Sequence, residues 1–191
     1  MVGPAPRLTR AALVLAAALA QAAGGATMAT WVADGNCRDG RPQGPYELRT
    51  GEGRLRVAGA FNEGVRTGSF IFWSDAGVRI AHLPFDHGLL NGTVAIWYEA
   101  PPGREPPRRF ESAWRRGKRD GETRSWYRDG HPRALTQYAA GRITASAGWT
   151  DTGARMADAA AGEAAQQDAT AIDALYDELD ALVREHMPRC G

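Results

Sequence analysis

Apolar and polar positions between residues 36 and 153 alternate in short runs, each about the length of a β-strand and separated from the next by a glycine-containing turn. One unit contains the run Ser69–Trp73, a turn at Asp75–Gly77 and a second apolar run. Aromatic and β-branched residues on both sides of such turns favour strands over helices, so we expect each unit to be an antiparallel hairpin. The two phenylalanines of the first run should face one side of the sheet and its tryptophan the other.

The hairpins repeat with a fixed register of glycine and aromatic positions. Each repeat contains a Gly-x-x-x-Gly pair, and the second glycines of successive pairs are 24, 24 and 29 residues apart. The pairs are Gly40/Gly44, Gly64/Gly68, Gly88/Gly92 and Gly117/Gly121. Five residues after the later second glycines stand Trp73, Trp97 and Trp126, and three residues before the next pair stand Phe61, Phe85, Trp114 and Tyr138. Such a period indicates stacked repeats, in which the glycines should adopt positive φ or let neighbouring backbones approach closely.

The first and last copies are incomplete, as the terminal repeats of a stacked array usually are. Arg49 takes the tryptophan position of the first copy and Cys37 its aromatic position, while a shortened fifth copy keeps Trp149 and Gly153. The extra residues of the third repeat fall at Pro101-Pro102, where we expect a longer hairpin tip.

From Ala154 the sequence becomes rich in Ala, Asp, Glu and Gln, which predicts a helix. An apolar stripe at i, i+3, i+4 and i+7 contains Ile172, Leu175, Tyr176, Leu179, Leu182, Val183 and His186. The segment Thr170–Asp173 resembles a capping box with Asp in place of Glu, and Pro188 should end the helix. We expect the stripe to pack on one face of the sheet. A partner helix or a membrane surface is the alternative, although the acidic polar face does not suit a membrane.

The first 22 residues have the features of a signal peptide. Arg7 and Arg10 precede an apolar run of about ten residues, too short to span a bilayer, and Ala20-Gln21-Ala22 offers a cleavage site after Ala22. We therefore expect an exported bacterial protein, periplasmic or secreted, with no transmembrane segment in the mature chain; an uncleaved anchor is the alternative. The predicted domains are the signal peptide over 1–22, the hairpin array over 23–153 and the acidic helical segment over 154–191.

Composition and charge add two constraints. The chain of 191 residues is 43% apolar and 24% charged, which argues against a disordered protein. Residues 23–150 carry a formal charge of +5 and residues 151–191 carry −6. The tail could therefore dock on the hairpin array by charge, or the basic array could attract an anionic partner.

Cys37 and Cys190 lie at opposite ends of the mature chain, in a protein expected in a compartment where disulfides persist. Eight or nine strands make a sheet about 40 Å wide, and a helix of about 30 residues running back from Ala157 spans about 45 Å. Because these lengths match, we hypothesise a Cys37–Cys190 disulfide that pins the helix antiparallel to the direction of repeat stacking.

The sequence contains no nucleophile elbow, no phosphate-binding loop and no zinc-type histidine spacing, so we predict a protein that is not an enzyme and that binds no cofactor or metal. His82, Asp86 and His87 could meet at a hairpin end as a metal site, but we expect them to be ordinary turn residues. The steps Trp97-Tyr98 and Trp126-Tyr127 could line a groove for a sugar or a peptide; packing between hairpins is the alternative.

The strongest signal for binding is the basic third repeat with its insertion. The candidate residues for an anion or a partner are Arg108, Arg109, Trp114, Arg115, Arg116, Lys118 and Arg119, with Arg104 nearby. An acidic protein, an anionic lipid or a cell-wall polymer are the possible ligands, and export argues against nucleic acid. A solvated hairpin partly neutralised by the acidic tail is the alternative.

The paired glycines, the Trp-Tyr or Phe-Trp step, the Asp-Gly turn and the aromatic residue before the next glycine resemble the MORN-repeat variant family over about residues 36–153. The resemblance implies a mainly β fold, an elongated antiparallel sheet of hairpins that binds partners, with no catalytic residues to carry over. We expect the C-terminal amphipathic helix to pack on this sheet or cap it.

The expected function is a non-enzymatic protein-binding or scaffold module of the cell envelope. Some proteins of the MORN-like family are labelled antitoxins or immunity proteins, so one alternative is an immunity protein that neutralises a secreted toxin. A second alternative is an envelope glycan-binding protein or hydrolase.

Overall fold

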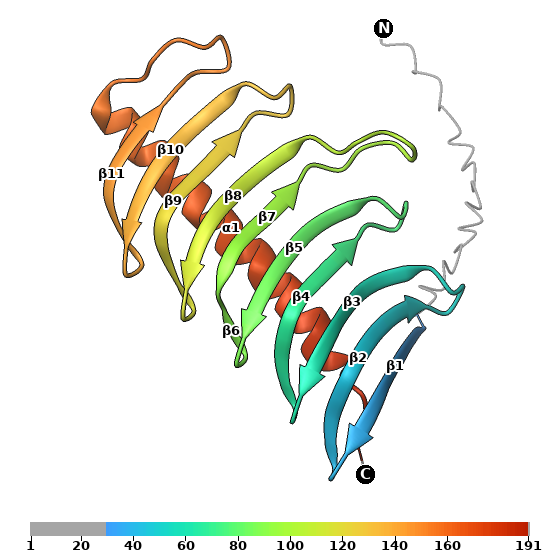
Figure 1. Cartoon of the computed structure of the whole chain (residues 1–191). Helices are drawn as coiled ribbons and strands as arrows, with labels where there is room; N and C mark the ends of the chain where they lie inside the picture. The colour runs from blue at the N-terminus through green and yellow to red at the C-terminus, as the bar shows by residue number, and fades with distance from the viewer. Residues whose placement is uncertain (1–29, 191) are drawn as a thin grey trace, which may run out of the picture.

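A computed structural model describes residues 30–190, which form one 11-stranded antiparallel sheet with a long helix against one face (Figure 1). The strands are β1 (Trp31–Arg38), β2 (Arg41–Thr50), β3 (Leu55–Asn62), β4 (Val65–Trp73), β5 (Arg79–Asp86), β6 (Leu89–Leu90), β7 (Gly92–Trp97), β8 (Arg108–Arg115), β9 (Lys118–Trp126), β10 (Pro132–Ala139) and β11 (Arg142–Gly148). They pair in chain order, with the short β6 beside β5. The mainly β fold of successive hairpins is confirmed, with more strands than the eight or nine expected because the incomplete end copies also form strands.

The first glycine of each pair closes a two-residue hairpin turn. Both central residues of the β3–β4 turn have positive φ, 50° at Glu63 and 85° at Gly64, which are the signs of a type I′ turn. The same combination recurs at Asp39–Gly40, His87–Gly88, Arg116–Gly117 and Ala140–Gly141. These are the inter-repeat turns at which the sequence predicted positive φ.

Each of these turns after the first is hydrogen-bonded to the strand that follows the turn before it. The N–H of Gly64 donates to the carbonyl oxygen of Pro42 at 2.9 Å. The equivalent bonds run from Gly88 to Arg66, from Gly117 to Leu90 and from Gly141 to Arg119, at 2.8 to 3.0 Å. In every case the acceptor lies two residues beyond the glycine of the previous turn, so the ladder holds successive repeats in one register.

The second glycine of each pair lies directly across from the aromatic residue that precedes the next pair. The cross-strand partners are Gly44 and Phe61, Gly68 and Phe85, Gly92 and Trp114, and Gly121 and Tyr138. All four glycines have positive φ, a backbone conformation in which a side chain is strained, and an added Cβ at Gly68 would meet nothing within 4 Å. The position therefore requires glycine for its backbone conformation. This cross-strand pairing explains why the second glycine and the aromatic residue keep a fixed spacing in the sequence.

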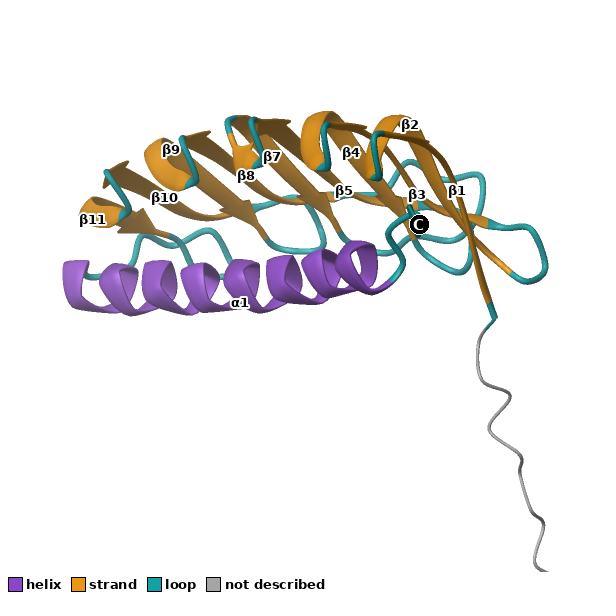
Figure 2. Cartoon of the chain, turned by 90° about the horizontal axis from the view of Figure 1, so that it is seen from below, coloured by secondary structure: helices purple, strands orange, loops and turns teal. Residues whose placement is uncertain are grey.

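Helix α1 (Asp158–Glu185) lies along one face of the sheet, from β11 to β2, and leaves the other face open (Figure 2). We call the helix-covered face the inner face and the other the outer face. Ile172, Leu179 and Val183 of the predicted stripe are buried in one core with inner-face rings such as Tyr46 and Phe70. The hydroxyl of Tyr46 donates to the carbonyl oxygen of His186, just past the helix, and burial raises its pKa to about 12.

The start of the helix differs from the capping-box prediction. The N-cap is Ala157, which makes no side-chain cap bond, and Thr170 lies in mid-helix, where its hydroxyl donates to the carbonyl oxygen of Gln166 at 3.0 Å. The box is wrong as a start signal because the alanine-rich segment before it has strong helix propensity and continues the helix by three further turns.

The Cys37 and Cys190 sulfurs lie at disulfide-bonding distance, with the Cα atoms 5.7 Å apart. Cys37 is on edge strand β1, and Cys190 follows the helix, which runs antiparallel to the stacking direction as predicted. The pair thus fastens the far end of the helix to the first repeat. The predicted signal peptide falls on residues 1–22 and lies outside the described residues.

We expect Cys37→Ser to lower the free energy of unfolding by about 5 kcal/mol, because the bond closes a loop with a sequence separation of 153. Urea unfolding of the oxidised chain measures this loss, and dithiothreitol should produce it in the wild type but not in the variant. Two free thiols in the untreated protein, found by mass spectrometry, would contradict the bond.

We expect Gly64→Ala to lower the free energy of unfolding by about 1 to 2 kcal/mol, since φ there is +85° while the nearest atoms lie at ordinary contact distance from an added Cβ. Gly162→Ala is the matched control: it lies in the helix with nothing within 4 Å and should stabilise by about 0.5 to 1 kcal/mol. Equal effects of the two substitutions on the denaturation midpoint would argue against backbone strain as the cause.

Candidate functional site

The structure distributes the predicted basic segment over both faces and one edge of the sheet. Trp114 and Arg119 lie on the inner face, whereas Arg108 lies on the outer face. Arg109 is the extra residue of a bulge at the start of β8. Arg115, Arg116 and Lys118 lie at the exposed β8–β9 turn. The cluster seen in the sequence is therefore not one surface.

The inner-face members of this segment are engaged by the chain's own helix. Arg119 is 8% exposed and donates to the Asp173 carboxylate at 2.7 Å. Its guanidinium lies over the rings of Trp114 and Tyr138, at 5.0 and 5.6 Å, and Trp114 stacks on Tyr176 of the helix. Among the described residues no group accepts a hydrogen bond from Trp114 Nε1 or Arg119 Nε. These two side chains hold the helix rather than face a partner.

Two further arginines pair with the helix in the same way. Arg66 of β4 pairs with Asp180, and Arg133 at the start of β10 pairs with Asp168. Asp168 is 6% exposed and also accepts a hydrogen bond from the Ser125 hydroxyl. Together with Arg119 and Asp173, these pairs join the basic array to the acidic tail, which is the docking by charge that the sequence allowed.

The outer face carries the repeat tryptophans. Trp97 is 8% exposed, and the guanidiniums of Arg79 and Arg108 lie over its ring at 4.2 and 4.8 Å. Arg108 also donates to Glu111 at 2.7 Å. Cation–π packing therefore occupies the ring of Trp97 and leaves little of it for a sugar.

Packing between repeats also engages the tyrosines of the two Trp-Tyr steps. The Tyr98 hydroxyl donates to the carbonyl oxygen of Trp126, and the Tyr127 hydroxyl donates to that of Trp149, both at 2.9 Å. A groove of about 280 Å³ remains between Trp126 and Trp149.

The β8–β9 turn, at the ends of the strands, exposes the remaining cations to solvent. Arg115 approaches Asp120 at 3.4 Å, and the backbone N–H of Arg116 donates to the Asn91 side chain at 3.3 Å. The side chains of Arg116 and Lys118 form no ion pair with any residue in the range 30–190.

The histidines do not assemble a metal centre. His82 lies 2.8 Å from the Ser69 hydroxyl, and burial together with the Arg79 charge holds its pKa below the usual value. His87 occupies a hairpin turn beside Asp86, 3.8 Å away. Within residues 30–190 no group of three or more His, Cys, Asp or Glu side chains could hold a metal ion.

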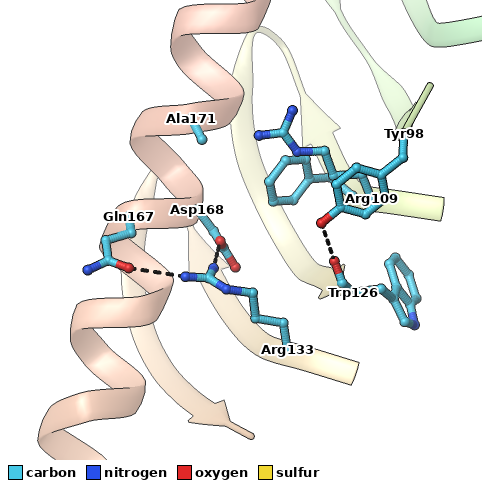
Figure 3. Close-up of a pocket in the computed structure, with 8 residues that line it drawn as sticks. Tyr98, Arg109, Trp126, Arg133, Gln167, Asp168 and Ala171 are labelled. Atoms are coloured by element: carbon cyan, nitrogen blue, oxygen red, sulfur yellow. Dashed lines mark hydrogen bonds and ion pairs between the residues drawn. The ribbon is translucent and has the colours of Figure 1, made fainter. Parts of the chain in front are cut away.

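Sequence reasoning missed a pocket of about 240 Å³ between the inner face and the helix (Figure 3). The Tyr98 ring, the backbone of Trp126 and the side chains of Arg109, Arg133 and Asp168 line it. Arg109 and Arg133 occupy the same repeat position, the bulged residue that follows the hairpin tip, and Arg56 is a third example. Their recurrence at one repeat position was visible in the sequence; the residues that surround each of them in the fold were not.

Comparison with known proteins gives no family: no protein-family model matches the chain, and a search of curated proteins finds no relative. The MORN-like expectation therefore rests on the repeat residues alone. None of the helices in the described part of the chain has the length and apolar character needed to cross a bilayer.

We expect Asp173→Asn to lower the free energy of unfolding by about 1 to 3 kcal/mol, because it leaves the Arg119 guanidinium buried without its counter-charge; Asp173 is 55% exposed, which moderates the loss. Thermal denaturation measures the loss. Asp177→Asn, on the solvent side of the same helix, should change the free energy of unfolding by less than about 0.5 kcal/mol.

The double variant Arg119→Met/Asp173→Asn should recover most of the stability, since it removes both charges and keeps the packed volume. A double variant as unstable as the sum of the single ones would mean that the two residues do not act as a pair.

Proposed function

We propose that this chain is an exported, MORN-like repeat protein that binds a protein partner through the outer face of its sheet. One observation carries the proposal. The chain's own helix occupies the inner face, while the outer face remains open along the whole row of hairpins (Figure 2). A broad, pleated surface built by a repeat array is a common binding surface in solenoid proteins.

The chemistry of the outer face supports a protein rather than a lipid or nucleic acid partner. Its arginines are largely paired there, Arg49 with Glu47, Arg108 with Glu111 and Arg124 with Glu122. Between these pairs stand half-buried Trp73 and Trp126. A surface of aromatic side chains and neutralised arginines resembles a protein interface more than a polyanion-binding surface.

Two further features support export. The predicted signal peptide directs the chain out of the cytoplasm, and a Cys37–Cys190 pair at bonding distance suits an oxidising compartment. An immunity protein is one form that such a binding protein could take.

A photo-crosslinking amino acid placed on each face of the protein, in its own host, tests this proposal. We expect one protein partner to be captured from Thr93 on β7 and from Gln137 on β10, both exposed on the outer face. Gln166 and Asp177, exposed on the helix, are the matched controls and should capture nothing specific.

Equal capture from the helix positions would contradict binding through the outer face. Recovery of a polysaccharide in place of a protein, lost on replacing Trp126 by alanine, would favour the glycan-binding alternative and overturn this proposal.

A further inference from the structure

Three arginines occupy one position of the repeat, and two of them pair with a carboxylate of the same chain. The position is the bulged residue on the second strand of the hairpin, occupied by Arg56, Ile80, Arg109 and Arg133 in successive copies. Arg56 pairs with Asp75 in the tip of the next hairpin and donates to the Trp73 carbonyl oxygen at 2.8 Å. Arg133 pairs with Asp168 and donates to the Gln167 side chain at 3.1 Å.

Arg109 differs, because its guanidinium has neither a hydrogen bond nor an ion pair to any residue from 30 to 190. It is held in place by rings, lying 5.6 Å from the centre of Tyr98 and 5.0 Å from that of Phe110. A half-buried guanidinium that is packed on aromatic rings and lacks an acceptor is prepared to bind an anion.

The residues that would neutralise Arg109 by repeat symmetry are replaced. The counterpart of Asp75 in the next hairpin is Arg128, which adds a second cation on the Tyr98 ring at 4.9 Å and donates to the Glu99 carbonyl oxygen. On the helix, the residue that lines the pocket near Arg109 is Ala171, whereas Arg133 has Asp168 (Figure 3). No carboxylate of residues 30–190 therefore pairs with Arg109, whereas both equivalent arginines have one, and Asp168 in the same pocket is taken by Arg133 and Ser125.

The pocket also limits what can accompany the anion. Phe110 and Tyr98 provide aromatic walls around a space of about 240 Å³. Asp168 already accepts from Arg133 and Ser125, so it offers no free charge for an ammonium group. The Tyr98 hydroxyl is likewise used by the Trp126 carbonyl oxygen.

We propose that this pocket binds a carboxylate carried on a small apolar or aromatic body, with Arg109 as the residue that receives the carboxylate. The carboxylate takes the place that Asp75 and Asp168 occupy beside the equivalent arginines, and the body of the ligand packs on Tyr98 and Phe110. Its source is either the C-terminal residue of a polypeptide or a free small acid. The site is independent of the outer face and of export.

Isothermal titration calorimetry on the full chain, with the disulfide intact, tests the pocket with two probes. One is acetyl-Gly-Gly-Phe with a free C-terminal carboxylate, titrated beside its C-terminal amide, and the other is benzoate. We expect the acid peptide or benzoate to bind, and the amide to bind at least about tenfold more weakly, because a charge-assisted pair with arginine is lost. Tighter binding of the peptide identifies a polypeptide C-terminus as the source, and tighter binding of benzoate identifies a free acid.

Two variants should abolish this binding for the same reason. Arg109→Gln removes the cation. Ala171→Asp places a carboxylate on the helix side of the pocket, where it would pair with Arg109 in place of the ligand. Arg104→Gln, an exposed arginine on the same hairpin, is the matched control and should bind as the wild type does. Unchanged melting temperatures establish that each variant is folded.

Equal affinity for the acid and the amide, an unaffected Arg109→Gln variant, or no binding of either acid at millimolar concentration would each overturn the proposal. Loss of binding in Arg104→Gln to the same degree would also overturn it, because the effect would then reflect general charge rather than this pocket.

Discussion

The structure depends on one recurring hydrogen bond, from the turn glycine N–H of each repeat to a carbonyl oxygen of the repeat before it. The glycine that donates it lies in a type I′ turn, in which the glycine and the residue before it both adopt positive φ. Because the inter-repeat turns share this geometry and this bond, successive hairpins stack at a constant offset. The second glycine, also at positive φ, lies across from the aromatic residue on the other strand of the same hairpin.

An open sheet of this length exposes two faces, and the chain covers only one of them. The inner face combines rings near the first repeats with arginines that meet aspartates of the helix. The apolar stripe provides the burial, whereas the ion pairs distinguish one alignment of the helix from others that would bury a similar area. Cys37 and Cys190 hold the same alignment at the far end. On the outer face Trp97 is buried by neighbouring side chains without a second layer.

The arginine positions connect the repeat to its candidate functions. At this bulge the side chain reaches either the tip of the next hairpin, as Arg56 does, or the helix, as Arg133 does, so a repeat can place a cation there without disturbing the stacking. Two such cations are neutralised within the molecule, and Arg109 is left for an external anion. In this way a repeat array that carries no catalytic motif can still acquire a specific pocket at the one copy in which the internal partner is lost.

The sequence by itself determined the hairpins, their register and the helix, because glycine spacing and side-chain periodicity act over a few residues and are visible in any one repeat. The lengths of sheet and helix also sufficed to pair Cys37 with Cys190. Tertiary structure alone decided which residues of the basic segment pair with the chain's own carboxylates and which do not. Arg119 meets Asp173, and Arg109 lines a pocket with Ala171, because helix and sheet, far apart in the chain, are brought into contact at one rotation and one offset. Local patterns carry no information about that offset, so Arg109 and Arg119, equivalent as charges in the sequence, acquire opposite roles in the folded protein.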